Sequence, residues 1–65
     1  MTVDIWYPDG GTGSWMIMRT IHPLADIPAE QVAQKVCDLN GWGEAYIAPT
    51  SERQETEAYL REDIR

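Results

Sequence analysis

Residues 3–21, VDIWYPDGGTGSWMIMRTI, decide the fold. Aromatic and β-branched residues are concentrated at the two ends of this stretch, over residues 3–7 and 14–21. Between them, residues 8–13 are rich in proline, aspartate and glycine, which favour turns. Two strand-like runs joined by such a turn are typical of a β-hairpin. We therefore predict that the chain begins with two antiparallel strands.

The second predicted strand carries apolar side chains on both faces. Because side chains alternate along a strand, Trp15, Ile17 and Ile21 are expected on one face, and Met16 and Met18 on the other. A helix can cover only one of these faces. The sequence therefore predicts that the other face is open to a partner.

A helix is predicted after the hairpin. Pro23 ends the second strand because proline lacks the N–H that a strand ladder needs. Asp26 is the expected N-cap, Pro28 suits the first turn, and Gly41 after Asn40 favours a left-handed stop. Helical spacing gives this segment an apolar face made of Ala29, Val32, Ala33, Val36 and Leu39.

A third strand and a second helix complete the predicted order. Residues 43–48 have strand character and end at Pro49, and Ser51 with Gln54 fits a capping box before a helix that runs to about Asp63. The prediction is an α+β fold in ββαβα order, in a single domain over residues 1–65. Its three-stranded antiparallel sheet carries one packed helix, and a C-terminal acidic helix follows.

The composition favours a protein partner with a basic surface. The chain has 65 residues, with 11 Asp or Glu against 5 Lys or Arg, and its net charge is −6. This charge disfavours direct binding to nucleic acid or to an anionic membrane. No signal peptide or membrane span is recognisable, so a cytoplasmic protein is expected. A chain this short builds a small core, which leaves a homodimer open as a way to complete it.

Catalytic, metal-binding and cofactor-binding patterns are weak. The glycine run 10–13 lacks the Lys and Ser or Thr of a phosphate loop and leads into a strand, so a hairpin loop is favoured. His22 and Cys37 are the one histidine and the one cysteine, with Asp26 or Asp38 as the acids that could orient the pair. Their positions favour ordinary loop and packing roles. We expect no enzyme activity, no metal and no cofactor.

The second predicted helix carries an acidic stripe. At 100° per residue, four acids and Tyr59 fall within a sector of about 100°. Arg53, Glu57 and Arg61 share the helix, and pairing among them lowers its net charge. The residues predicted to contact a partner are this stripe and four other acids: Glu52, Glu55, Tyr59, Glu62, Asp63, Asp4, Asp9, Glu30 and Asp38.

In size, acidity and predicted fold, the chain resembles small phage-encoded inhibitors, among them the anti-CRISPR proteins that block Cascade or Cas nucleases. The resemblance spans the whole chain as a set of class features. It implies a protein that acts in the cytoplasm of a host cell, binds the DNA-contacting surface of a CRISPR or other nucleic-acid-processing complex, and excludes DNA by acidic mimicry. The residues that carry it are Asp4, Asp9, Asp26, Glu30, Asp38, Glu44 and the acidic stripe within residues 51–63.

A second hypothesis places the working surface on apolar residues. A small structural or regulatory interaction module, for which a homodimer is left open, would bind through Trp6, Trp15, Met16 and Met18. Such a surface would bind with little dependence on salt, whereas an acidic surface would release its partner as salt rises.

Overall fold

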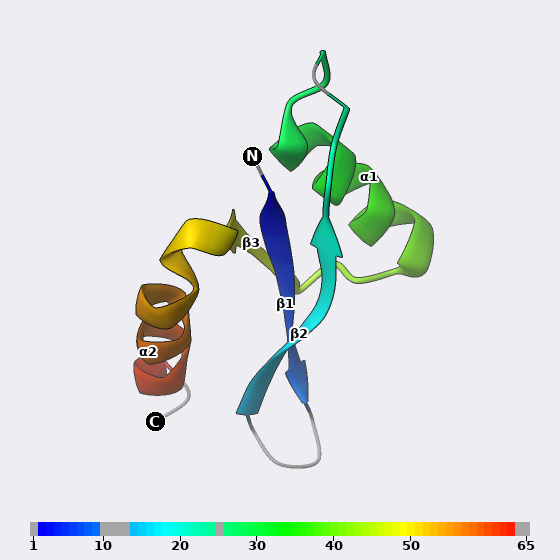
Figure 1. The fold of residues 1–65 in the computed structure, drawn as a ribbon. Helices are drawn as coiled ribbons and strands as arrows, with labels where there is room; N and C mark the ends of the chain where they lie inside the picture. The colour runs from blue at the N-terminus through cyan, green and yellow to red at the C-terminus, as the bar shows by residue number, and fades with distance from the viewer. Residues whose placement is uncertain (1, 10–13, 25, 64–65) are drawn as a thin grey trace.

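A three-stranded antiparallel sheet lies between two helices in the computed structural model, which describes residues 2–9, 14–24 and 26–63 (Figure 1). The α+β class and the ββαβα order are as predicted. The glycine-rich turn predicted over residues 10–13 lies outside the described residues. The elements are β1 (Val3–Asp9), β2 (Ser14–Ile21), α1 (Ala29–Asn40), β3 (Tyr46–Pro49), a short 3-10 turn η1 (Thr50–Glu52) and α2 (Arg53–Asp63).

The first strand is the centre of the sheet, whose order is β2-β1-β3. Both neighbours run antiparallel to β1, with Val3 opposite Ile21 of β2 and opposite Pro49 of β3. The third strand is shorter than predicted: residues 43 and 44 form a turn, and the ladder begins at Tyr46. The central strand β1 therefore lies between the two helices, with α1 on one face of the sheet and α2 on the other.

A β-bulge in β2 changes which side chains share a face. Ile5 pairs with Arg19, but Trp6 pairs with Ile17, so Met18 is an extra residue without a partner in this register. A bulge breaks the strict alternation of side chains along a strand. Ile21 therefore lies on the α1 side of the sheet and Ile17 on the other side, and the predicted shared face of these two residues is wrong.

Small side chains let α1 approach one face of the sheet. Ala29, Ala33 and Cys37 recur every fourth residue and are buried in a core with Val3, Ile5 and Ile21. The helix ends as predicted at Gly41, whose φ of 71° is left-handed. The backbone N–H groups of Gly41 and Trp42 donate to the carbonyls of Asp38 and Cys37, which satisfies the last turn.

The starts of both helices differ from the predicted caps. The N-cap of α1 is Pro28, not Asp26, and no side chain caps the helix. Ser51 lies inside η1, which follows Pro49 without a side-chain cap, so the predicted capping box is wrong. In both cases the fixed φ of proline, close to −60°, already suits the entry into a helix.

The helix α2 covers the other face of the sheet. Trp6 on β1 and Ala48 on β3 are buried there, together with Thr56 and Leu60 of α2. The buried side chain of Leu60 docks α2 on the sheet. Figure 1 shows α1 and α2 on opposite sides of the strands, so surfaces on the two helices face away from each other.

Candidate protein-binding surface

The predicted contact residue Asp4 is buried inside the protein. Its side chain is fully shielded from solvent, on the sheet face that α2 covers. The prediction of an exposed Asp4 is therefore wrong. Strand alternation places Asp4 on the face opposite Val3 and Ile5. The prediction that one sheet face is open to a partner is wrong, because α2 docks across that face and the sequence does not show this docking.

Asp4 is held by three side chains from separate parts of the chain. Thr20 donates to Oδ1 at 2.8 Å and Thr50 donates to the same atom at 3.0 Å. Arg53 donates from Nε to Oδ2 and from Nη2 to Oδ1, both at 3.0 Å. The two parallel bonds match the planar guanidinium to the planar carboxylate. We call these four residues the Asp4 cluster; it joins β1, β2, η1 and α2.

The cluster stabilises the ionised carboxylate. The hydrogen bonds from Arg53 lower the pKa of Asp4, against burial, which raises it; Thr20 and Thr50 lower it further. The same contact raises the pKa of the Arg53 guanidinium. No local sequence pattern predicts the contact between Asp4 and Arg53, because the two residues lie 49 positions apart.

The acidic stripe begins in η1 at Glu52 and continues along α2, and it is exposed where it is described. Glu52, Glu55 and Tyr59 all lie on the surface, and Tyr59 is 57% exposed. The ring of Tyr59 lies 5.9 Å from that of Tyr46, centre to centre, so the two rings are in contact on the surface. The side chains of the other three predicted contacts, Asp9, Glu62 and Asp63, lie outside the described residues.

The arginines described on α2 do not neutralise this acidic stripe, because both pair with carboxylates outside it. Arg53 turns toward buried Asp4, and Arg61 pairs with Glu57 at 3.4 Å on the helix surface. Neither pair involves Glu52 or Glu55. The structure therefore keeps these two carboxylates free of ion pairs among the described residues.

The predicted acids of α1 are exposed but lie on the opposite side of the sheet. Glu30 and Asp38 are both on the surface of α1, where Asp38 accepts a hydrogen bond from Gln34 Nε2 at 3.2 Å. The structure does not bring them together with Glu52 and Glu55. One flat partner surface cannot contact both groups at once.

The apolar surface differs from the predicted one. Trp6 is 2% exposed, so it belongs to the core, and its indole N–H has no hydrogen-bond partner among the described residues. Trp15 is half-buried, whereas Met16 and Met18 are exposed. In the alternative hypothesis, Trp6 therefore cannot contact a partner, whereas Met16 and Met18 are accessible.

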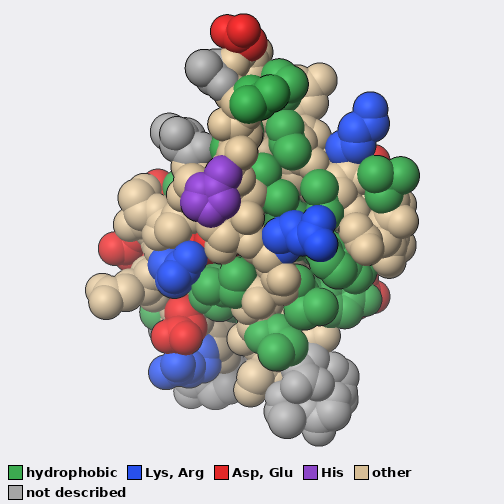
Figure 2. Space-filling view, turned by 45° about the vertical axis from the view of Figure 1, so that its right-hand side comes forward, with side chains coloured by type: hydrophobic (Ala, Val, Ile, Leu, Met, Phe, Trp, Pro, Cys, Tyr) green, Lys and Arg blue, Asp and Glu red, His purple; other side chains and the backbone are tan. Residues whose placement is uncertain are grey.

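Further exposed apolar residues flank α1, and the sequence pattern missed them. Leu24 and Ile27 precede the helix, and Leu39, predicted as core, is 81% exposed. Leu39 shares a helix stripe with Val32 and Val36 on the flank of α1, away from the Ala33 line that faces the sheet. Figure 2 shows hydrophobic side chains gathered in a broad band on this side, with Lys and Arg side chains within and beside it.

Little in the described residues suits catalysis. Cys37 is buried in the α1 core, and burial raises the pKa of its thiol, with a further contribution from Asp38; both effects oppose a reactive thiolate. His22 is exposed just beyond β2. Among the described residues no three His, Cys, Asp or Glu side chains group to hold a metal, and no helix there has the length and apolar character needed to cross a membrane.

No protein-family model, curated protein or solved structure matches the chain. The features of the molecule that bear on its function are therefore the exposed acids, the cation pairs and the apolar band.

Proposed function

We propose that this chain is an inhibitor of the phage or mobile-element type, similar in action to anti-CRISPR proteins. It binds a basic, DNA-contacting surface of a CRISPR or other nucleic-acid-processing complex and excludes DNA. The observation that carries the proposal is the direction of Arg53: because it binds Asp4 inside the protein, Glu52 at the end of η1 and Glu55 on α2 are exposed carboxylates without an ion pair among the described residues.

The charge count supports the same surface. Asp4 and Arg53 neutralise each other, which leaves ten carboxylates and four cationic side chains on the rest of the chain. The net charge of −6 is therefore carried outside the Asp4 cluster. Lysines and arginines that bind DNA phosphates gain favourable electrostatic energy when carboxylates are presented to them in place of those phosphates.

Tyr59 supplies an anchor beside the acids. Aromatic residues at the centre of an interface often contribute much of the binding energy, and the exposed ring of Tyr59 lies beside that of Tyr46. Glu30 and Asp38, on the other side of the sheet, contribute to the long-range field that speeds association rather than to the contact itself.

The test compares two charge reversals on the same helix. Tagged wild-type protein, the Glu52→Lys/Glu55→Lys variant and the Glu57→Lys variant are used to capture partners from a bacterial lysate, and retained proteins are identified by mass spectrometry. We expect wild type to retain a nucleic-acid-binding complex that elutes as ionic strength rises from about 0.05 to 0.5 M. The double variant should bind it about tenfold more weakly or worse.

Glu57→Lys is the matched control, because Glu57 lies on α2 outside the stripe and pairs with Arg61. It should bind the complex as wild type does. A competition assay then measures whether the protein displaces DNA from the captured complex. Equal binding by all three proteins, or a complex that holds DNA and the inhibitor together, would refute charge mimicry by α2.

A further inference from the structure

Two tyrosine rings meet on the surface where α2 borders the sheet. Tyr46 of β3 and Tyr59 of α2 are 40% and 57% exposed, and their ring centres lie 5.9 Å apart with the planes tilted by 36°. Tyr46 lies on the α2 side of β3, as does buried Ala48, because side chains two apart on a strand share a face. Tyr59 therefore contacts Tyr46 and still exposes more than half of its surface.

A carboxylate lies one helical turn before Tyr59. Residues four apart on a helix are neighbours on its surface, with Cβ atoms about 5–6 Å apart, so Glu55 lies next to Tyr59. Glu55 is exposed and has no ion pair among the described residues. We call Tyr46, Glu55 and Tyr59 the tyrosine–glutamate site. It presents aromatic rings and a negative charge side by side.

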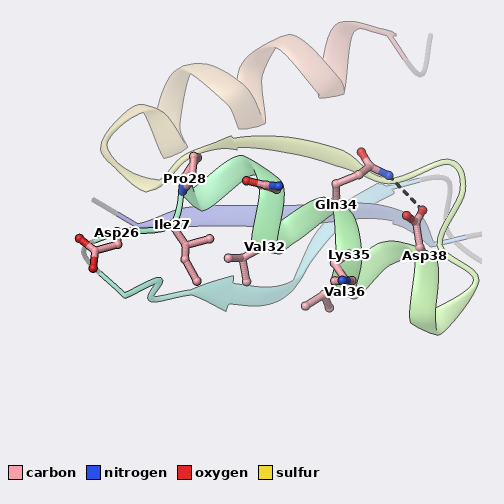
Figure 3. Close-up of a pocket in the computed structure, with 9 residues that line it drawn as sticks. Asp26, Ile27, Pro28, Val32, Gln34, Lys35, Val36 and Asp38 are labelled. Atoms are coloured by element: carbon pink, nitrogen blue, oxygen red, sulfur yellow. Dashed lines mark hydrogen bonds between the residues drawn. The ribbon is translucent and has the colours of Figure 1, made fainter.

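The cations described in the chain are all directed elsewhere. Arg53 and Arg61 form ion pairs with other carboxylates. Arg19 lies on the α1 side of the sheet, because it pairs across the strands with a residue of the α1 core. Figure 3, which views the groove along α1, shows Lys35 on that helix with the strands between it and α2. The described residues therefore supply no cation to the tyrosine–glutamate site.

We propose that the tyrosine–glutamate site takes an arginine side chain of the partner, with the guanidinium plane against the ring of Tyr59 and its N–H groups directed at Glu55. A cation over an aromatic face is attracted by the negative charge density of the ring. The planar guanidinium can stack on such a ring and donate two parallel hydrogen bonds to one carboxylate. The inference rests on the function proposed above, because the basic DNA-contacting surface supplies the arginine.

Other occupants satisfy only part of this site. A lysine ammonium is compact and strongly hydrated, so it pairs with Glu55 but offers no flat face to Tyr59. A nucleic-acid base would stack on the ring, but its phosphate would meet Glu55 and a chain of net charge −6. An apolar side chain would cover the ring and leave Glu55 unpaired beside a dry contact. Arginine alone matches the ring and the carboxylate together.

The test compares two glycine-rich peptides that carry the same number of basic residues, arginine in one and lysine in the other. Equal charge isolates the contribution of the guanidinium. We expect wild-type protein to bind the arginine peptide about two- to fivefold more tightly in an NMR titration. The side-chain resonances of the bound arginine should also move upfield, because the ring current of Tyr59 acts on protons that lie over its face.

Variants separate the ring from the charge. Tyr59→Leu should lose the arginine preference and keep its affinity for the lysine peptide, whereas Tyr59→Phe, which retains a ring, should keep the preference. Glu55→Gln should weaken the binding of both peptides. Glu57→Gln, the matched change outside the stripe, should weaken them much less. Circular dichroism checks that each variant folds.

The arginine preference and the charge mimicry can fail separately, because the peptides contain no nucleic-acid-processing complex. Equal affinity of wild type for the two peptides, or a preference that survives in Tyr59→Leu, would overturn the arginine site even if the lysate experiment captures such a complex. A clear arginine preference without capture of a nucleic-acid-binding complex would support the site and refute the proposed function.

Discussion

Arg53 donates two hydrogen bonds of 3.0 Å to the carboxylate of Asp4, and this contact attaches the start of α2 to the central strand. The carboxylate is fully buried, whereas the arginine side chain is 48% exposed. The two partners are therefore unequal: water can solvate Arg53 when Asp4 is removed, but it cannot solvate Asp4 when Arg53 is removed.

This asymmetry predicts the order of two variants. Asp4→Asn should lower the free energy of unfolding by about 2–3 kcal/mol, because it weakens charge-assisted hydrogen bonds. Arg53→Ala should cost more than Asp4→Asn, because it leaves the buried carboxylate of Asp4 as an unpaired charge. Urea denaturation measures both. Asp38→Asn, at an exposed carboxylate with one hydrogen bond, is the control and should cost less than about 0.5 kcal/mol.

Combining the two changes tests whether they act on one interaction. If Asp4 and Arg53 are coupled, the double variant should be less destabilised than the sum of the single variants. Strict additivity of the two effects would contradict the contact.

The lowered pKa of Asp4 predicts a loss of stability in acid. Because the folded-state pKa lies below the unfolded-state value of about 3.9, the stabilisation is complete above that pH and is lost as pH falls through the folded-state pKa. Thermal unfolding of wild type and Asp4→Asn should therefore give melting temperatures that converge in acid. A constant difference from neutral pH down to about pH 2 would show that ionisation of Asp4 contributes nothing.

Two glycines near the end of α1 offer a matched comparison of backbone strain. A Cβ added at Gly41 or at Gly43 meets no atom within 4 Å, but only Gly41 has a left-handed φ, of 71°. Gly41→Ala should therefore cost about 1–2 kcal/mol, while Gly43→Ala should be nearly neutral. Denaturation midpoints of the two variants measure the difference. Equal midpoints would mean that the stop of α1 does not depend on this conformation.

The docking of α2 predicts a contrast between two leucines. Leu60, on the side of α2 that faces the sheet, is 2% exposed, and Leu39 of α1 is 81% exposed. Leu60→Ala should lower the free energy of unfolding by about 2–4 kcal/mol, because it removes buried methyl groups and leaves a cavity. Leu39→Ala should change it by less than about 0.5 kcal/mol. A small effect at Leu60 would indicate that α2 adds little to the fold.

Local patterns predicted most of the secondary structure and less of its packing. The turn-rich run between two β-rich runs predicted the hairpin, and Gly41 marked the end of α1, because both depend on the conformational preferences of neighbouring residues. The bulge at Met18 and the burial of Asp4 depend on strand register and on a helix that arrives at position 53. Neither the bulge nor the buried carboxylate produces a periodic pattern in the sequence.

The candidate surfaces divide in the same way. Helical spacing alone placed Glu52, Glu55 and Tyr59 on one exposed stripe. It also placed Leu39 with the core, because apolar spacing identifies a stripe but not how far the sheet extends beneath it. Among the described residues, Arg19 and Lys35 are the cations without an ion pair, and this depends on the pairs that Arg53 and Arg61 form in the folded chain.

The bulge at Met18 also affects how the sheet can meet other chains. A bulge interrupts the regular spacing of N–H and C=O groups that a neighbouring strand would need, and β2 is an edge strand. On the opposite edge, β3 has only four residues and ends at Pro49, which lacks an N–H. Both borders of this open sheet therefore discourage extension into fibrils, and recognition is left to side chains on the helices.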